Sequence, residues 1–285
     1  MSYQAIDVRP VSGALGAEIF GVDVSGDLGN QVVDELHRAF LDHHVLCFRD
    51  QELTPQQQVA FAGRFGKLDI YPFLKSVADA PEVIEILKTE NDSYNFGGAW
   101  HSDTAYLERP ALGSMLYAIE TPPTGGDTMF ANMHLAYEAL SDGMKRMLDG
   151  LVGINSSDQN YRGAGGRNEK MQDLDGMKDK IVASTEVLVA EQPVVRTHPE
   201  TGRKGLYVSR VHTTRFKDMT EAESRPLLDY LSGHAVRPEF TCRIDWRPGT
   251  LVFWDNRSTQ HFAVNDYQGS RRRMHRVTLM GDRPS

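Results

Sequence analysis

The sequence predicts a β-sandwich or β-barrel with added helices, and three observations favour this mainly β fold class. Short apolar runs of strand character recur along the chain, with glycine, proline and other turn residues between them. Helical patterns gather near the start of the chain and in insertions, so they do not alternate with strands as βαβ units require. No glycine-rich phosphate-binding loop follows a strand, which removes support for a nucleotide-binding α/β fold.

In the first part of the chain, strands are expected around two helices. The first helix, at 30–42, has an apolar face and follows a short strand and a glycine-rich turn region. The second begins at Thr54-Pro55, because threonine is a good N-cap and proline suits the first helical turn. The expected elements are strands at 6–8, 44–49, 82–88 and 112–119 and helices at 30–42 and 54–66.

The second part of the chain contains one long polar stretch between further strands. Residues 155–180 hold four glycines and lack a clear apolar period, which predicts a lid loop over a site. A surface insertion without function is the alternative. Helical periodicity at 132–148 is broken once, at Ser141-Asp142-Gly143. The remaining expected elements are strands at 193–197, 205–209, 240–246, 250–254 and 273–280 and a helix at 220–232. We expect residues 1–285 to form a single domain.

Composition and charge limit the possible partners. The formal net charge is −8 and the pI is about 5.7, which disfavours nucleic acid and anionic membranes but allows a small anionic substrate in a local basic pocket. Cys47 and Cys242 lie in apolar, strand-like runs and form no CxxC motif, so we expect buried thiols in a reducing compartment. No leader-like or membrane-spanning run is present, and a cytoplasmic location is expected.

The strongest local feature is the pair His101-Ser102-Asp103. Residues two apart in an extended segment point to the same side, so an imidazole and a carboxylate would enter one space. Two histidines and one carboxylate are the ligand set of non-haem Fe(II) oxygenases. His261 is the candidate third ligand, because the apolar strand in LVFWDNRSTQH delivers it just beyond the strand end. A histidine held by a backbone carbonyl is the alternative for His261. Of the other histidines, His134 is expected to be solvated and His212 is a possible site-lining residue.

A basic run, RRRMHR at 271–276, leads into an apolar strand. Strand alternation places Arg272 and Arg276 on one face, roughly 13 Å apart at a rise of about 3.3 Å per residue. That spacing suits two anions on either side of a metal, each met by a planar bidentate donor. A solvated edge strand or a nucleic-acid contact remains the alternative.

Several landmarks in order resemble the taurine dioxygenase / 2,4-dichlorophenoxyacetate dioxygenase (TauD/TfdA) family of Fe(II)- and 2-oxoglutarate-dependent oxygenases. The landmarks are LGAEIFGVD, FGKL, WHSD, PPTGGDT, AYEALSDGMKRMLDGL, VVRTHPETGRKGLYV, WDNRSTQHFAVNDY and RRRMHRVTLMGDRP, and they cover nearly the whole chain. The resemblance implies a double-stranded β-helix, which is a cupin-like jelly roll, with inserted helices.

The resemblance also implies the site. His101, Asp103 and His261 would bind iron, Arg272 and Thr128 would bind 2-oxoglutarate, and Trp254 would pack near the metal. Arg276 would face the primary substrate or the inner end of 2-oxoglutarate, and the other implied substrate-binding residues are Tyr71, Gly97 and Tyr207. With O2, such an enzyme would hydroxylate its substrate and release succinate and CO2. Retention of Asp103 argues for oxygenation, because a halogenase needs a small residue there.

Departures from the family pattern fall in the substrate pocket. Tyr71 replaces a histidine of taurine-specific members, Leu74 replaces a tyrosine, and Gly97 replaces an amine-binding asparagine. The expected substrate is therefore a small carboxylate or sulfonate with an apolar or aromatic body, aryloxyalkanoate-like rather than taurine. The alternatives are a taurine or alkylsulfonate dioxygenase and a non-redox metal-binding jelly roll, which would have no need of the Arg272/Thr128 anion site. The family resemblance suggests a homodimer or homotetramer.

Overall fold

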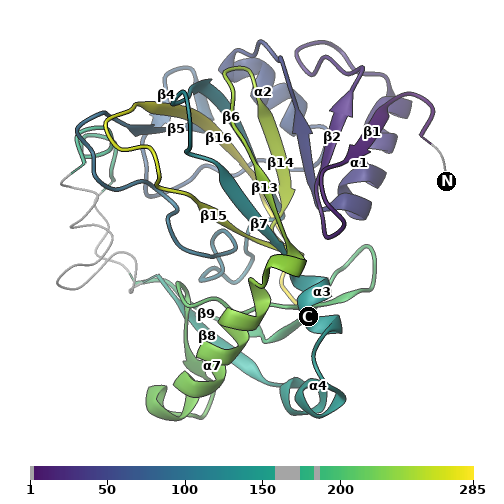
Figure 1. The fold of residues 1–285 in the computed structure, drawn as a ribbon, viewed down its shortest axis with the longest axis vertical. Helices are drawn as coiled ribbons and strands as arrows, with labels where there is room; N and C mark the ends of the chain where they lie inside the picture. The colour runs from purple at the N-terminus through teal and green to yellow at the C-terminus, as the bar shows by residue number, and fades with distance from the viewer. Residues whose placement is uncertain (1–2, 158–173, 183–186) are drawn as a thin grey trace.

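The computed structural model describes residues 3–157, 174–182 and 187–285, and its centre is a pair of facing β-sheets (Figure 1). The larger sheet has eight strands in the order β1-β2-β3-β14-β6-β16-β5-β4, and only β2 and β3 pair in parallel. Its strands are β1 (Asp7–Pro10), β2 (Ala17–Phe20), β3 (Val45–Phe48), β4 (Ser76–Val77), β5 (Ala80–Lys88), β6 (Gly113–Glu120), β14 (Leu251–Asp255) and β16 (Arg272–Leu279). The smaller sheet has the order β13-β7-β15, from β7 (Thr128–Asn132), β13 (Thr241–Ile244) and β15 (Thr259–Ala263).

Apolar side chains from both sheets share one core. Leu116, Val252 and Met274 of the larger sheet belong to the same buried cluster as Phe130 and Ile244 of the smaller sheet. Two sheets that bury their inner faces against each other form a sandwich. The predicted mainly β, jelly-roll architecture is confirmed. Cys47 and Cys242 are also in this core, as free and buried thiols, as expected.

Helices cover the outer face of the larger sheet near the N-terminus. α1 (Asn30–His43) and α2 (Pro55–Ala62) bury Phe40 and Phe61 in a second cluster with Phe253. The rings of Phe40 and Phe253 stack with centroids 4.0 Å apart. Thr54 caps α2 through a reciprocal capping box with Gln57, so the predicted helix start is confirmed.

A second lobe lies below the sheets in Figure 1 and contains the remaining helices and short strands. Its elements are α3 (Met133–Glu138), α4 (Asp142–Leu148), α7 (Glu221–Ala235), the 3-10 helix η1 (Pro238–Phe240), β8 (Val152–Ser156), β9 (Val189–Pro193), β10 (Val195–Thr197), β11 (Lys204–Leu206) and β12 (Thr213–Phe216). The expected break in the helical pattern is confirmed, because the Ser141 side chain accepts a hydrogen bond from the Met144 amide and starts a new helix.

Sequence patterning missed several strands, and one of them changes the site. β2, β7, β8, β12 and β15 are short and mix polar with apolar residues. Apart from β2, which pairs with the preceding β1, their partners are distant in sequence: His261 pairs with Phe130 in the β15–β7 ladder. The expectation that His261 lies just beyond a strand end was therefore wrong, since it sits in the middle of β15. Of the expected lid at 155–180, residues 158–173 lie outside the described part of the chain.

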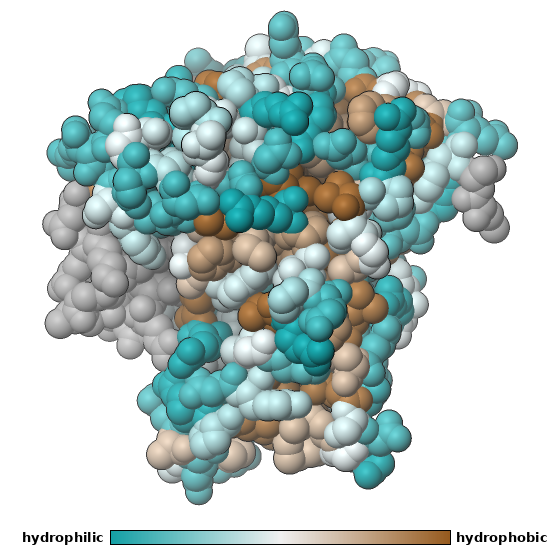
Figure 2. Space-filling view, viewed as in Figure 1, coloured by the Kyte–Doolittle hydropathy of each residue, from teal (hydrophilic) through white to brown (hydrophobic). Residues whose placement is uncertain are grey.

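The face of the molecule in Figure 2 is mostly hydrophilic, and hydrophobic residues show mainly between the sheets and the second lobe. Exposed large apolar side chains occur at scattered positions such as Ile70 and Tyr230, which is ordinary for a protein surface. Within the described residues, no helix has both the length and the apolar character that crossing a bilayer demands.

Gly113 of β6 gives a test of the close packing against the neighbouring strand β14. A Cβ at this position would lie 2.7 Å from the Trp254 carbonyl oxygen and 3.0 Å from the Phe253 ring. Gly113→Ala should lower the free energy of unfolding by about 1–3 kcal/mol, because overpacking forces backbone or side-chain shifts. Urea unfolding measures the change. Gly233→Ala in α7, where a Cβ meets nothing within 4 Å, is the control and should raise stability by about 0.5–1 kcal/mol. Wild-type stability for Gly113→Ala would contradict this packing.

Candidate active site

His101, Asp103 and His261 come together on one side of the sandwich. One ligand atom from each residue lies within 4.8 Å of the others, and all three residues are buried. Asp103 Oδ1 is 3.8 Å from His101 Nε2 and 3.9 Å from His261 Nε2. The three donors therefore face one point.

Backbone pairing sets the two histidines side by side. The His101 amide donates to the His261 carbonyl at 3.1 Å, and the His261 amide donates to the His101 carbonyl at 2.8 Å. This isolated antiparallel bridge brings the two rings to a centroid distance of 4.2 Å. His101 Nδ1 lies 2.7 Å from the Ala99 carbonyl, which can only accept, so Nδ1 carries a proton and Nε2 faces the side of Asp103.

Asp103 is oriented through its second carboxylate oxygen. Oδ2 accepts hydrogen bonds from Ser114 Oγ at 2.7 Å and from Asn256 Nδ2 at 3.3 Å. Oδ1 is left facing the histidines, with Arg276 Nη1 at 3.4 Å. Burial alone would raise the pKa of Asp103, but Arg276 and the two histidines outweigh burial and hold the pKa well below its usual range. The carboxylate is therefore ionised and aimed.

Asn256 links Asp103 to the turn between β14 and β15. Its side-chain carbonyl accepts from the Asp103 amide and from Trp254 Nε1, both at 3.1 Å. Ser114 and Asn256 were not predicted as site residues. Asn256 follows the apolar strand in a polar stretch, for which the sequence predicts only a loop.

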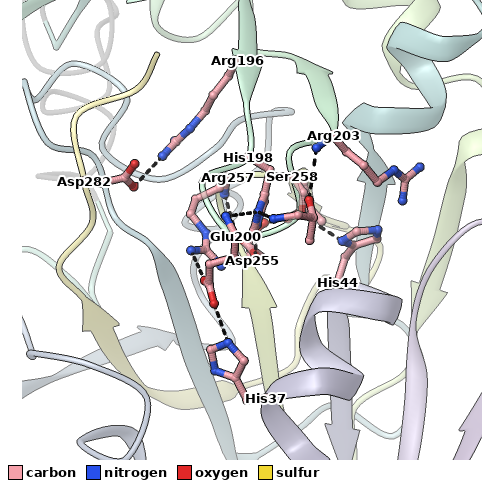
Figure 3. A network of polar contacts seen from close by, with 12 residues as sticks. His37, His44, Arg196, His198, Glu200, Arg203, Asp255, Arg257, Ser258 and Asp282 are labelled. Atoms are coloured by element: carbon pink, nitrogen blue, oxygen red, sulfur yellow. Dashed lines mark hydrogen bonds and ion pairs between the residues drawn. The ribbon is translucent and has the colours of Figure 1, made fainter. Parts of the chain in front are cut away.

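A buried network fixes that turn (Figure 3). The Asp255 carboxylate accepts from the backbone amide and guanidinium of Arg257 at 2.7–2.9 Å and from His198 Nε2 at 3.0 Å. Arg257 also donates to Glu200 at 2.6 Å, and Glu200 pairs with His37 on α1. The network anchors residues 255–258 and thereby places Asn256 against Asp103 and β15 against His101.

A cavity opens beside the three donors and contains both arginines of the predicted strand face. Its lining residues are Ile86, Phe96, Gly97, His101, Leu116, Thr128, Trp254, His261, Ala263, Arg272 and Arg276. Arg272 is buried, and within the described residues its Nε and Nη2 have no hydrogen-bond partner. Burial lowers the pKa of Arg272 from its usual value. Arg272 packs over the Trp246 ring at 5.4 Å, and Trp246 Nε1 donates to Thr128 Oγ1 at 3.0 Å.

Aromatic rings continue from Arg276 around to His101. The Arg276 guanidinium lies 4.8 Å from the centroid of the Tyr71 ring. Neighbouring ring centroids are then 5.6 Å apart for Tyr71 and Phe73, 6.1 Å for Phe73 and Tyr106, 5.1 Å for Tyr106 and His212, and 6.1 Å for His212 and His101. We call Tyr71, Phe73, Tyr106 and His212 the aromatic arc. The arc connects Arg276 with His101, but its four residues, including the predicted substrate-binding Tyr71, are not among those that line the cavity.

Two other predictions can be placed. Tyr207 does not line this cavity: it lines a small separate one with Ser102 and Gln260 and packs against Arg196 at 5.0 Å. Gly97 does line the main cavity, with φ of +86° and a hypothetical Cβ 3.7 Å from the His101 ring. The expectation that His134 is solvated was wrong. It is buried and its Nδ1 donates to the Lys204 carbonyl at 2.9 Å, because α3 packs against β11.

The outward-facing arginines of the basic run are paired with acids. Arg271 contacts Glu90 and Glu120, and Arg273 contacts Glu85. Strand alternation thus divides the run into an inner pair that lines the cavity and an outer pair neutralised on the surface. The nucleic-acid alternative loses its basic patch.

Known proteins resemble the chain over nearly its full length. Residues 7–278 match the family described as "Taurine catabolism dioxygenase TauD, TfdA family". An alkylsulfatase of Acinetobacter baylyi is 36% identical over 280 residues, 98% of this chain and 86% of that protein. An alpha-ketoglutarate-dependent sulfate ester dioxygenase of Pseudomonas putida is 34% identical, covering 98% of this chain and 91% of that protein. A crystal structure of a taurine dioxygenase from Burkholderia xenovorans superposes with a TM-score of 0.82 at 36% identity, over 99% and 93% of the two chains.

Two buried histidines beside the anchored turn predict a pH-dependent stability. Burial lowers the pKa of His44 to about 3 and that of His134 to about 4. The unfolded chain protonates both near pH 6.5. Between those values the unfolded state binds more protons, so stability falls as the pH falls. We expect the metal-free protein to lose roughly 2–4 kcal/mol between pH 7 and pH 5 in urea unfolding. His134→Gln should reduce this loss, and a loss equal to that of the wild type would contradict the assignment.

Proposed function

We propose that this chain, which belongs to the TauD, TfdA family of dioxygenases, oxidises an organic sulfate ester whose anionic head is bound by Arg276. Membership of the family makes the protein a non-haem iron dioxygenase that uses Fe(II), 2-oxoglutarate and O2 and hydroxylates a small anionic substrate with release of succinate and CO2. A sulfate ester ends in the same SO3 group as a sulfonate, and the sequence predicts a carboxylate or a sulfonate as the anionic head.

The donor set suits the metal. Two imidazole nitrogens and one carboxylate oxygen converge from His101, His261 and Asp103, with further positions open toward the cavity. These residues would hold Fe(II). Bound there with 2-oxoglutarate and O2, the iron supplies the oxidising power that converts a substrate C–H bond into C–OH. The protein contributes orientation, through Ala99 on His101 and through Ser114 and Asn256 on Asp103.

Arg272 and Thr128 would bind the distal carboxylate of 2-oxoglutarate. A buried guanidinium with unsatisfied N–H groups is costly unless an anion arrives to pair with it. Trp246 holds the Thr128 hydroxyl oxygen and packs on Arg272, so both groups are oriented before the ligand binds.

The observation that carries the substrate class is the position of Arg276. Its guanidinium lies in the metal cavity, 3.4 Å from the ionised Asp103 and over the Tyr71 ring. A sulfate placed there directs its alkyl group along the aromatic arc, past the side of the metal site. Gly97 offers no side chain, and Tyr71 packs on Arg276, so the pocket favours an apolar body over the amine of taurine.

Hydroxylation at the carbon that bears the ester oxygen would complete the reaction without a further cofactor. The new hydroxyl loses its proton as the C–O bond to sulfate breaks, the bonding electrons leave with sulfate, and an aldehyde remains. Arg276 would hold the departing anion.

The cytoplasmic location and the homodimeric or homotetrameric state stay predictions.

Binding of the co-substrate gives the first test. Under argon, the protein with Fe(II) and 2-oxoglutarate should show a weak visible charge-transfer band. Arg272→Ala should weaken 2-oxoglutarate by at least about tenfold, because each charge-assisted hydrogen bond is worth about 1.5–3 kcal/mol. His101→Ala is the control and should abolish the band. An unchanged affinity in Arg272→Ala would refute its role, and no band in the wild type would remove the iron assignment.

The substrate class is tested by succinate release over alkyl sulfates, alkylsulfonates, aryloxyacids, small carboxylates and taurine. Alkyl sulfates should stimulate release most and should yield aldehyde and inorganic sulfate in equal amounts. Arg276→Gln should raise the KM for hexyl sulfate by about 10- to 100-fold, since a buried charge pair is lost. If aryloxyacids or taurine gave the larger stimulation, the sulfate ester would be the wrong substrate.

A further inference from the structure

Residues 174–182, which we call the wall segment, run along the outside of the strip that carries the start of the aromatic arc. The Lys75 amide donates to the Lys180 carbonyl at 2.8 Å, and the Val182 amide donates to the Phe73 carbonyl at 3.0 Å. Leu74 and Ile181 form an antiparallel bridge between these bonds. The wall segment is therefore paired, backbone to backbone, with residues 73–75.

Side chains of the wall segment also reach the arc. Leu174 and Met177 are 4% and 1% exposed, and they belong to the same buried cluster as Tyr71, Phe73 and Tyr106. A displacement of the turn at 174–177 would leave this cluster underpacked. The shape of the arc thus depends on where that turn sits.

Asp92 holds the turn. Its Oδ1 accepts from the Asp175 amide at 2.7 Å, and its Oδ2 accepts from the Gly176 amide at 3.2 Å. Oδ2 also accepts from the amide and hydroxyl of Thr89 at 2.7 and 2.9 Å, which ties the carboxylate to the end of β5. Burial alone would raise the pKa of Asp92, but the hydrogen bonds from Thr89, Gly176 and Asp175 outweigh burial and lower it, so these are bonds to an ionised carboxylate.

Gly176 lets the turn approach β5 closely. A Cβ at this position would lie 2.3 Å from the Leu87 carbonyl oxygen, a contact that backbone atoms must move to relieve. The next residue, Met177, accepts a hydrogen bond from the Leu87 amide on its sulfur at 3.4 Å. A carboxylate on one side and a strand backbone on the other clamp the turn.

We propose that Asp92, with Gly176, is a positioning residue for the primary substrate: the clamp holds the wall segment against residues 73–75 and so keeps the aromatic arc and Tyr71 in place beside Arg276. This rests on the proposed function for the arc. The groups assigned to 2-oxoglutarate, Arg272 and Thr128, are braced by Trp246 and have no such dependence on the wall segment.

Two variants test the clamp by different means. Asp92→Asn removes the charge and one acceptor, whereas Gly176→Ala displaces the turn without changing any charge. Lys178→Gln is the matched control, because Lys178 lies in the same segment and its side-chain ion pair with Asp175 is exposed. With hexyl sulfate as the probe, both test variants should raise the KM by about tenfold, since small displacements of a positioning group have effects of this size or more. Succinate released without aldehyde should rise in proportion.

The co-substrate separates positioning from general damage. The affinity for 2-oxoglutarate, from the charge-transfer band, should stay within about twofold of the wild type in both variants. A parallel loss of 2-oxoglutarate binding, or an unchanged KM and unchanged coupling for hexyl sulfate in both variants, would overturn the proposal.

Hydrogen exchange tests, without any substrate, whether Asp92 holds the wall segment in place. Asp92→Asn should speed amide exchange by at least about tenfold in the peptides covering 174–182 and 71–75, with β14 and β15 unchanged. Faster exchange in the first peptide alone would refute the link to the arc. If the wild-type enzyme did not oxidise hexyl sulfate, the proposed substrate class would be wrong. The exchange rates of the wild type and Asp92→Asn would still show whether Asp92 holds the wall segment.

Discussion

The site depends on the hydrogen bonds that the buried carboxylate of Asp255 accepts. This carboxylate is fully inaccessible, yet it accepts hydrogen bonds from the backbone and side chain of Arg257 and from His198. A buried charge without such partners costs several kcal/mol, so the turn at 255–258 has one strongly preferred shape. That shape sends β15 back antiparallel to β7 and leaves Asn256 pointing at Asp103. The anchored turn therefore positions two parts of the site: the strand that carries His261, and the side-chain amide of Asn256 that orients the Asp103 carboxylate.

Hydrogen bonds to and between backbone groups then position the two histidines among the proposed metal donors. The amide–carbonyl pair between His101 and His261 fixes their separation, and the Ala99 carbonyl fixes the His101 tautomer. Ser114 and Asn256 donate to one oxygen of Asp103 and leave the other facing the two histidines, where the proposed metal would bind. Such outer contacts orient ligands before the ion arrives, which reduces the reorganisation that binding requires.

Polarity divides the cavity into two sides. Arg272 is buried and, within the described residues, its Nε and Nη2 groups have no hydrogen-bond partner, which is a cost to the folded protein. Arg276 is stabilised by Asp103 and by the Tyr71 ring. The apolar aromatic arc beyond it is held from outside by the wall segment. On the proposed role of Asp92, residues outside the cavity would also shape the substrate site.

The sequence predicted those features that depend on residues close together along the chain. Strand alternation separated Arg272 and Arg276 from their outward neighbours, and the capping pattern located α2. The His-x-Asp pair and His261 were singled out from the sequence, and the structure brings these three residues together. What the sequence missed has no local signature. β15 is short and polar at its start, and only its pairing with β7, about 130 residues away in the chain, makes it a strand. Ser114, Asn256 and Asp92 are ordinary polar residues until distant amides and carboxylates meet them. The sequence by itself determined which residue types are present and which face of a strand each one occupies. Only the tertiary structure decided their partners, because a buried hydrogen bond joins two positions that are close in space and far apart along the chain.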